Sequence, residues 1–251
     1  MKLTLCIATM RPREGIVPDT VMSLVQTATQ RDDMPVLWHW NTPEHNDGVV
    51  GSYNAMYRES TQYPYADSEI LAYIHDDVWI REEGWDERVL KEFEDPTVGV
   101  VGFGGARHHG SPDLYKIPYK LQQLARFDYY SNVDDAETHG TRFADVCDVA
   151  VLDGFSVIVR RELLDRAGGW PNIPGGFHNY DYAICGLAHR FNYRVRCIGI
   201  RCHHEGGKTS TTPQYQEWAA REKGMTDQAI HEASHEWFYD EFRDVMPWSC
   251  Q

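Results

Sequence analysis

The sequence lacks long apolar runs. No segment approaches the roughly 20 consecutive apolar residues that a transmembrane helix needs. The opening stretch MKLTLCIATMRPREG has one lysine and a short apolar run, too short for the core of a secretion signal, and it lacks a small-residue cleavage site. This stretch is typical of a first buried strand instead. We therefore expect a cytoplasmic protein without a membrane span.

The sequence also lacks a disulfide pattern. Its six cysteines are scattered without a C-x-x-C pair, which favours reduced thiols in a chain of this length. Cys197, Cys202, His203 and His204 leave zinc binding open as an alternative. Their C-x4-C-H-H spacing is not that of a zinc finger, and adjacent histidines rarely bind one tetrahedral ion together.

Basic residues are few. The 24 Lys and Arg stand against 38 Asp and Glu, which gives a net charge of −14. This balance disfavours non-specific binding to nucleic acid or to an anionic membrane, although it leaves room for a local basic groove. Candidates to line such a groove are Arg107, His108, His109, Lys116 and Lys120.

The first hundred residues alternate between strand and helix patterns. Apolar residues Val21, Leu24, Val25 and Ala28 recur at helical spacing after a possible cap at residues 19–20. Strands are predicted at 3–8, 34–40, 69–74 and 98–105, and helices at 19–28, 49–59 and 84–95. Such alternation predicts an α/β fold with a mainly parallel sheet and helices on its faces.

The second half is less regular at first. Residues 104–145 show weak periodicity and are expected to be a long excursion that shapes a substrate site. Residues 148–170 then predict strand, turn, strand and short helix. A helix from about Tyr180, a last strand within 193–207 and an amphipathic helical tail at 214–246 follow. No repeat or Gly/Ser linker interrupts the chain, so one domain is expected.

Three polar clusters stand at the ends of predicted elements. They are His75-Asp76-Asp77, the region around Asp181, and the pair His203-His204. Each alone is weak, because Asp is common in turns. If all three converge at one edge of the sheet, their carboxylates and imidazoles would suit Mg²⁺ or Mn²⁺, with a diphosphate supplying further oxygens.

Several motifs follow one another along the chain: LTLCIAT, LAYIHDDV, GWDERVLKEFEDPTVGVVGFGG, LDGFSVIVRRELLDRAGGW, FHNYDYAICGLAHRFNYRV and HHEGG. In this order and at this spacing they resemble the glycosyltransferases of the GT-A fold, in particular the large inverting family 2 and its relatives, over about residues 3–210. The resemblance implies a single domain with a Rossmann-like mixed sheet. It also implies a nucleotide-sugar-binding half (1–103), an acceptor and catalytic half (104–210) and a helical tail (211–251).

The resemblance assigns metal-site roles. The family's D-x-D turn falls on residues 75–77, so Asp77 is expected to bind the metal, and Asp76 to lie towards the ribose or the metal. His75 replaces the first Asp of that pattern, and it is expected either to face the nucleotide or to orient Asp77. His203 or His204 matches the family's third metal ligand.

The resemblance also assigns the reacting groups. Asp181 matches the general base, which takes the proton of the acceptor hydroxyl as its oxygen attacks the anomeric carbon. The alternative for Asp181 is a helix-capping role. Asp153 and Trp170 match positions on the acceptor side.

The nucleotide pocket is the part where this sequence departs from the family. Thr9 and Arg11 stand after the first strand, and Asn41 ends the second. Arg11 is expected to contact a phosphate and Asn41 the base. Tyr53-Asn54 stand where the family has Arg-Asn.

The expected reaction is metal-dependent, inverting transfer of a sugar. The expected cofactor is Mn²⁺ or Mg²⁺, and the donor is a nucleoside-diphosphate sugar, with a UDP-sugar as first choice. The acceptor is a saccharide or, as a minority alternative, a hydroxymethylated base in DNA, because compact enzymes of this type occur in bacteriophages. A catalytically inactive nucleotide- or sugar-binding module is the alternative function. His231 and His235 of the tail are interpreted as part of an ordinary helix face.

Overall fold

The structure, a computed structural model, describes most of the chain. The residues described are 1–10, 19–30, 32–42, 44–110, 126–134, 140–206, 209–247 and 250.

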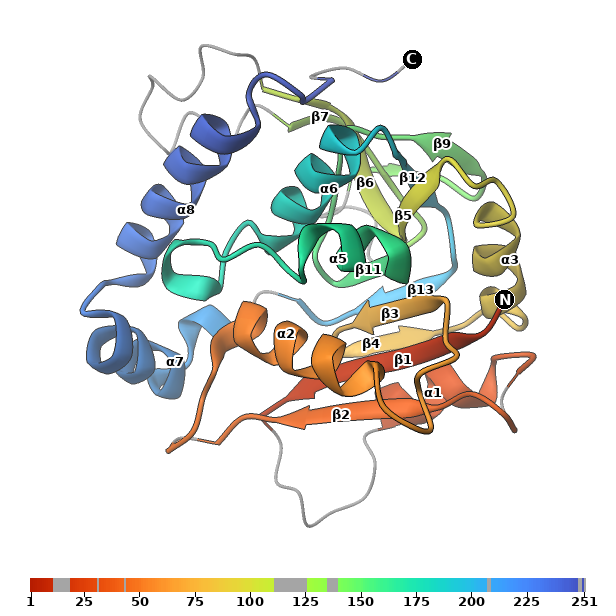
Figure 1. Cartoon of the computed structure of the whole chain (residues 1–251), viewed down its shortest axis with the longest axis horizontal. Helices are drawn as coiled ribbons and strands as arrows, with labels where there is room; N and C mark the ends of the chain where they lie inside the picture. Colours follow the sequence, from red (N-terminus) through yellow and green to blue (C-terminus); the bar gives the residue numbers. More distant parts are fainter. Residues whose placement is uncertain are drawn as a thin grey trace.

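A mixed main sheet forms the centre of the molecule (Figure 1). Its strand order is β2 (Val36–Trp40), β1 (Leu3–Thr9), β3 (Ile70–Ile74), β11 (Ser156–Arg160), β5 (Val98–Gly102), β12 (Arg194–Ile198) and β9 (Val146–Asp148). β1 pairs in parallel with β2 and β3, and β5 with β12, whereas β11 and β9 run antiparallel to their neighbours. The predicted mainly parallel α/β sheet is therefore confirmed.

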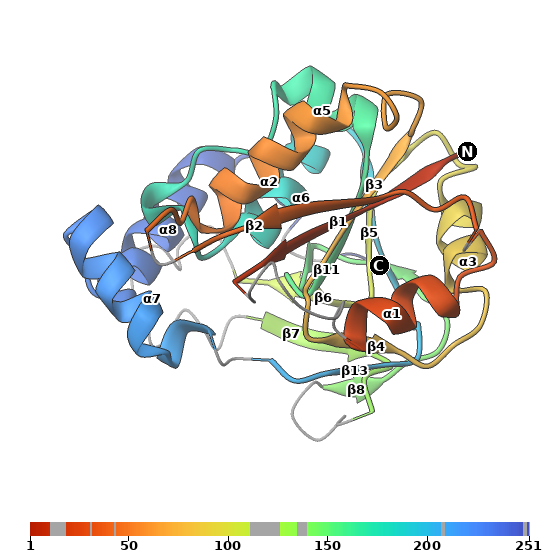
Figure 2. The same cartoon turned by 90° about the horizontal axis from the view of Figure 1, so that it is seen from below.

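Helices cover both faces of this sheet (Figure 2). One face carries α2 (Gly48–Ser60), α5 (Arg161–Ala167) and α6 (Tyr180–Arg190), and the other carries α1 (Asp19–Gln26) and α3 (Trp85–Glu92). Because both faces are covered, β3 is apolar along its whole length, and every one of its residues is buried. The helices predicted at 19–28, 49–59 and 84–95 are confirmed.

The C-terminal tail is helical, as predicted. It contains α7 (Pro213–Trp218), a π-helical turn (Ala219–Lys223) and α8 (Asp227–Phe242). α8 packs along α6 through Phe238 and Phe242, which belong to the same core as the inner side of α6. Short 3-10 turns lie at Pro174–Gly176 and Thr209–Thr211.

The prediction of an irregular excursion over 104–145 is wrong for the residues described there. A second sheet has the order β10 (Val151–Leu152), β6 (Gly104–His109), β7 (Arg126–Ser131) and β8 (Thr141–Arg142). Gly104 and Gly105 make β6 hard to recognise in the sequence, because glycine is uncommon in strands. In the structure, close packing requires both of them. A Cβ on Gly104 would lie 2.3 Å from the Tyr129 hydroxyl, and one on Gly105 would lie 2.8 Å from the Val151 carbonyl oxygen.

The predicted last strand at 193–207 is two strands. β12 belongs to the main sheet, and β13 (Cys202–His204) pairs antiparallel with β4 (Val78–Ile80). The molecule is a single domain; its division at residues 103 and 210 stays a prediction. No helix in the described ranges is long and apolar enough to cross a membrane.

Candidate active site

The turn after β3 is anchored from three directions. The His75 backbone N–H donates to the Phe155 carbonyl at 3.0 Å. Thr9, at the end of β1, donates from its hydroxyl to Asp76 Oδ2 at 2.5 Å, and the Thr20 hydroxyl of α1 donates to the Asp76 carbonyl at 2.6 Å. The turn therefore has a defined shape at the carboxyl edge of the parallel strands, where α/β sheets bind ligands.

β13 brings one of the two adjacent histidines to this turn. His203 stands opposite Trp79 in the β13–β4 pair, with the ring centroids 5.6 Å apart. Because neighbouring side chains of a strand point to opposite faces, His204 points the other way. Its Nε2 lies 3.4 Å from Asp77 Oδ1. Of the two predicted alternatives, the structure brings His204, and not His203, to Asp77.

His75, Asp77 and His204 form a compact group of possible metal ligands. Their ligand atoms all lie within 4.8 Å of one another. Asp77 Oδ1 is 3.9 Å from His75 Nδ1, and the side chains are 33%, 24% and 9% exposed, in chain order. Two ligand atoms that each lie about 2.1 Å from the same ion, at right angles to each other, are roughly 3 Å apart. The distances between the ligand atoms of this group would therefore have to shorten only a little for a divalent cation to bind.

The charge states of this group suit a cation. Burial by itself raises the pKa of Asp77, but the neighbouring imidazoles of His204 and His75 outweigh it and bring the pKa to about 2. Burial, together with His204, lowers the pKa of His75. At neutral pH the group therefore offers a carboxylate and a neutral imidazole from this turn, the forms that bind metals.

The zinc alternative is not supported among the residues that the structure describes. Cys197 and Cys202 do not join His203 or His204 in a group with metal-binding spacing. The Cys197 thiol lies in the core and donates to the Tyr130 carbonyl.

Tyr180, for which the sequence predicts no role in the site, links the turn to α6. Its hydroxyl lies 2.7 Å from His75 Nε2 and 3.1 Å from the Gly154 carbonyl oxygen. Burial raises the pKa of Tyr180 well above its usual value, so it is a neutral phenol at physiological pH. The 105 residues that separate Tyr180 from His75 leave no sequence signal for this contact.

Asp181 is the second residue of α6, next to Tyr180. The predicted helix start is confirmed, and Asp181 Oδ1 accepts a hydrogen bond from the Tyr182 backbone N–H at 2.9 Å. Before the helix, Asn179 has a φ of 60°, in the left-handed region. Its side-chain amide donates to Ser234 at 2.7 Å and therefore anchors this backbone to α8.

The remaining predicted site residues lie in different surroundings. Asp153 accepts a hydrogen bond from the Tyr129 hydroxyl at 3.1 Å. Asn41 is 8% exposed and donates from its side-chain amide to the Ser52 hydroxyl in α2. Trp170 is only 4% exposed, which leaves no open ring face for a sugar. Arg11 lies outside the described residues.

Trp170 belongs to an aromatic cluster beneath the site. Its ring centroid lies 4.9 Å from those of both Tyr53 and Tyr73, and its backbone N–H donates to Asn54 Oδ1 at 2.9 Å. Tyr53-Asn54 therefore hold the chain after α5 against α2. In the structure this is a packing contact.

The histidines of α8 lie on a helix face that packs against the turn before α6. His235 is 4% exposed, with Nδ1 3.0 Å from the Asn179 amide, and His231 stacks on His178 at a centroid separation of 3.7 Å. His178 is also paired with Asp227 at 2.6 Å. These contacts brace the turn before Asp181 rather than forming a separate metal site.

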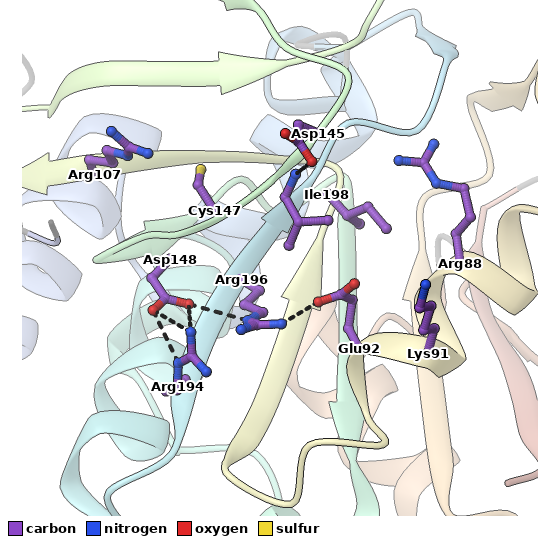
Figure 3. Close-up of a pocket in the computed structure, with 11 residues that line it drawn as sticks. Arg88, Lys91, Glu92, Arg107, Asp145, Cys147, Asp148, Arg194, Arg196 and Ile198 are labelled. Carbon is purple, nitrogen blue, oxygen red and sulfur yellow. Dashed lines mark hydrogen bonds and ion pairs between the residues drawn. The ribbon is translucent and has the colours of Figure 1, made fainter.

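A cavity of about 590 Å³ opens at the β9–β12 edge (Figure 3). Its lining does not include His75, Asp77 or His204. Arg194 forms a bidentate pair with Asp148, with its closest contact at 2.7 Å, and Arg196 pairs with Asp148 and Glu92. These paired charges tie the edge strand to α3.

Of the residues expected to line a basic groove, Arg107, His108 and His109 lie in β6, and the groove itself stays a prediction. Arg107 lines the cavity of Figure 3. His109 is 2% exposed and packs against Tyr182, with ring centroids 4.5 Å apart. Lys116 and Lys120 lie outside the described residues.

Comparisons with known proteins identify one family by sequence and similar folds among solved structures. A sequence model described as "Glycosyltransferase like family" matches residues 49–242. Among solved structures, the mannosyltransferase PcManGT from Pyrobaculum calidifontis, in complex with GDP-Man and Mn²⁺, has a TM-score of 0.51 at 16% identity, over 95% of this chain and 69% of that one. GalNAc-T7, with UDP, GalNAc and Mn²⁺, has a TM-score of 0.56 at 12% identity, over 96% of this chain and 56% of that one.

A third similar structure is A197 from STIV, with a TM-score of 0.49 at 13% identity, over 83% of this chain and 88% of that one. No curated protein matches the sequence. At these identities, the likeness to PcManGT and GalNAc-T7 shows a shared GT-A fold.

Proposed function

The chain belongs to the glycosyltransferase-like family, and from this premise we propose that it transfers a sugar, with inversion, from a nucleoside-diphosphate sugar to an acceptor hydroxyl. The observation that supports this most is the group of His75, Asp77 and His204 at the carboxyl edge of the sheet. A divalent cation at such a place would stabilise the charge on a leaving diphosphate.

The proposed cation site rests on Asp77 and His204, whose nearest ligand atoms are 3.4 Å apart. When bound there, a divalent ion neutralises the charge that grows on the leaving diphosphate. The pKa of Asp77 is lowered to about 2, so its carboxylate is ionised at neutral pH and supplies the negative charge that holds the ion. Asp76, which accepts a hydrogen bond from Thr9 through one oxygen, is proposed to lie towards the ribose or the metal.

Asp181 is the proposed general base. It stands in the first turn of α6, directly after the residue whose hydroxyl contacts His75. A carboxylate there takes the proton of the acceptor hydroxyl as its oxygen attacks the anomeric carbon, opposite the leaving diphosphate. The positive end of the α6 dipole favours the ionised form of Asp181, by roughly 0.3–1 kcal/mol. Asp153 is the second candidate for this role.

For the donor, similar structures contain GDP-Man in PcManGT and UDP with GalNAc in GalNAc-T7, each with Mn²⁺. We propose a donor of the same chemical class, a nucleoside-diphosphate hexose, with a UDP-sugar tried first. A saccharide is the preferred acceptor. A hydroxymethylated DNA base is the minority alternative, and the net charge of −14 counts against it.

A donor screen tests the proposal. Purified protein is mixed with UDP- and GDP-sugars, and release of nucleoside diphosphate is measured with Mn²⁺, with Mg²⁺ and with EDTA. We expect metal-dependent release from one donor and its loss in Asp77→Asn. Full release in EDTA would contradict the metal site. Tight donor binding without any release, over a full set of donors and acceptors, would favour the inactive binding module.

A further inference from the structure

Tyr180 makes two contacts through one hydroxyl group. Its oxygen lies 2.7 Å from His75 Nε2 and 3.1 Å from the carbonyl oxygen of Gly154. The first contact is to the proposed metal turn, and the second is to the loop between β10 and β11. Tyr180 itself begins α6, so a single side chain joins three elements around the site.

The positions of the protons follow from this geometry. A phenol has one proton to donate, and a backbone carbonyl can only accept. Both contacts are hydrogen bonds only if Tyr180 donates to Gly154 and accepts from His75. His75 must then carry its ring proton on Nε2. A neutral imidazole has one ring proton, so Nδ1 keeps its lone pair. Nδ1 is also the atom that faces Asp77 Oδ1, at 3.9 Å.

The surroundings hold the hydroxyl of Tyr180 in place. A Cβ on Gly154 would lie 2.2 Å from it, so residue 154 approaches as closely as only glycine allows. The ring of Tyr180 packs edge-on against Tyr53, with centroids 5.5 Å apart, and it is 8% exposed overall. The hydroxyl therefore has little freedom to leave His75.

We propose that Tyr180 is a positioning residue that turns the Nδ1 lone pair of His75 towards Asp77 and His204 and makes His75 the third ligand of the cation. The inference rests on the metal site of the proposed function. The resulting set has two imidazoles and one carboxylate. Mg²⁺ prefers oxygen ligands and water, whereas imidazole suits transition metals, so this set selects Mn²⁺ over Mg²⁺.

The opposite proton arrangement gives a different role. If Tyr180 donated to His75 Nε2, the ring proton would lie on Nδ1 and His75 would act as a hydrogen-bond donor to Asp77. In that case His75 would not bind the ion, and the Gly154 contact of Tyr180 would have no proton. Long-range ¹H–¹⁵N NMR spectra of the metal-free protein distinguish the two forms. We expect a proton on His75 Nε2; a proton on Nδ1 would overturn the proposal.

Metal affinity provides the second test. Mn²⁺ alone is titrated into the protein, and free Mn²⁺ is followed by electron paramagnetic resonance, so no sugar donor or turnover is involved. We expect Tyr180→Phe to weaken Mn²⁺ binding by about 10–100-fold, the usual effect of losing a partner that orients a ligand. The matched control is Tyr57→Phe, which likewise removes one phenol hydroxyl, with its hydrogen bond to Asp165 at 2.8 Å, but outside the site. Equal Mn²⁺ affinity in Tyr180→Phe and the wild type would overturn the proposal.

Metal preference provides the third test. His75→Asp exchanges one imidazole for a carboxylate, so the ratio of the Mg²⁺ Kd to the Mn²⁺ Kd should fall. An unchanged ratio would mean that His75 is not a ligand. The outcomes also separate the two proposals. If the wild type binds Mn²⁺ and Asp77→Asn does not, but the Tyr180 and His75 variants match the wild type, only this inference fails. If the wild type binds no Mn²⁺, the metal site of the proposed function fails with it.

Discussion

Replacing Asp181 by Asn separates its proposed chemical role from a structural one. The side chain stands in the first turn of α6, where Oδ1 accepts a hydrogen bond from the Tyr182 backbone N–H at 2.9 Å. Asn keeps an acceptor oxygen and nearly the same shape, so this bond survives. Only the charge near the helix end is lost, which costs roughly 0.3–1 kcal/mol of stability. For a chain of this size, that lowers the melting temperature by no more than about 4 °C.

The effect of Asp181→Asn on turnover should be much larger. Loss of a positioned base lowers kcat by about 10²–10⁴-fold, and donor affinity should stay unchanged. The assay is release of nucleoside diphosphate under saturating Mn²⁺, with donor binding measured by calorimetry. Glu162→Gln is the matched control, because it removes a charge from the first turn of α5. Normal turnover in Asp181→Asn would refute the assignment and direct attention to Asp153.

Three further predictions concern the surroundings of the site. His204→Ala should raise the Mn²⁺ concentration needed for activity by at least about tenfold, and His203→Ala should not, as measured by metal titration of turnover; equal effects would contradict the assignment. Trp170→Ala should lower the free energy of unfolding by about 3–5 kcal/mol, as measured in urea. Trp170→Phe should leave the KM for the acceptor unchanged. A raised KM without loss of stability would mean that the ring binds the acceptor. Burial lowers the pKa of His231 to about 3 and of His235 to about 4, from 6.5. The unfolded chain therefore binds more protons than the folded one from about pH 6.5 down to about pH 3, so stability should fall as the pH drops through this window. Thermal melts that stay constant, or that respond equally when both positions are glutamine, would contradict this.

The parts of the site that the sequence predicted are those set by local patterns. An apolar run that ends in two aspartates predicts a buried strand with a polar end, and β3 with its turn has this form. The start of α6 at Tyr180 follows from the turn residues before it and the helical spacing after it. The sequence does not decide between His203 and His204, because that choice depends on the register of β13 against β4, which the sequence does not specify.

The parts that the sequence did not predict depend on contacts between distant segments. Tyr180 meets His75 only because β3 and α6 fold against each other. Trp170 follows two glycines, a pattern that fits an exposed ring as well as a buried one. In the structure, Tyr53 and Tyr73 enclose the ring. The sequence does not predict β6, because Gly104 and Gly105 suggest a turn, whereas in the structure both glycines allow close packing within the sheet.

The most direct measurement is the position of Mn²⁺ in crystals grown with Mn²⁺ and a nucleoside diphosphate. An anomalous difference map recorded near the manganese absorption edge locates the ion without assumptions about ligands. We expect a single peak roughly 2.0–2.6 Å from Asp77 Oδ1 and His204 Nε2, with a diphosphate oxygen on the same ion and His75 Nδ1 facing it. A peak elsewhere, such as beside His203 and Cys202, or a bound diphosphate with no ion at Asp77, would contradict the proposed site.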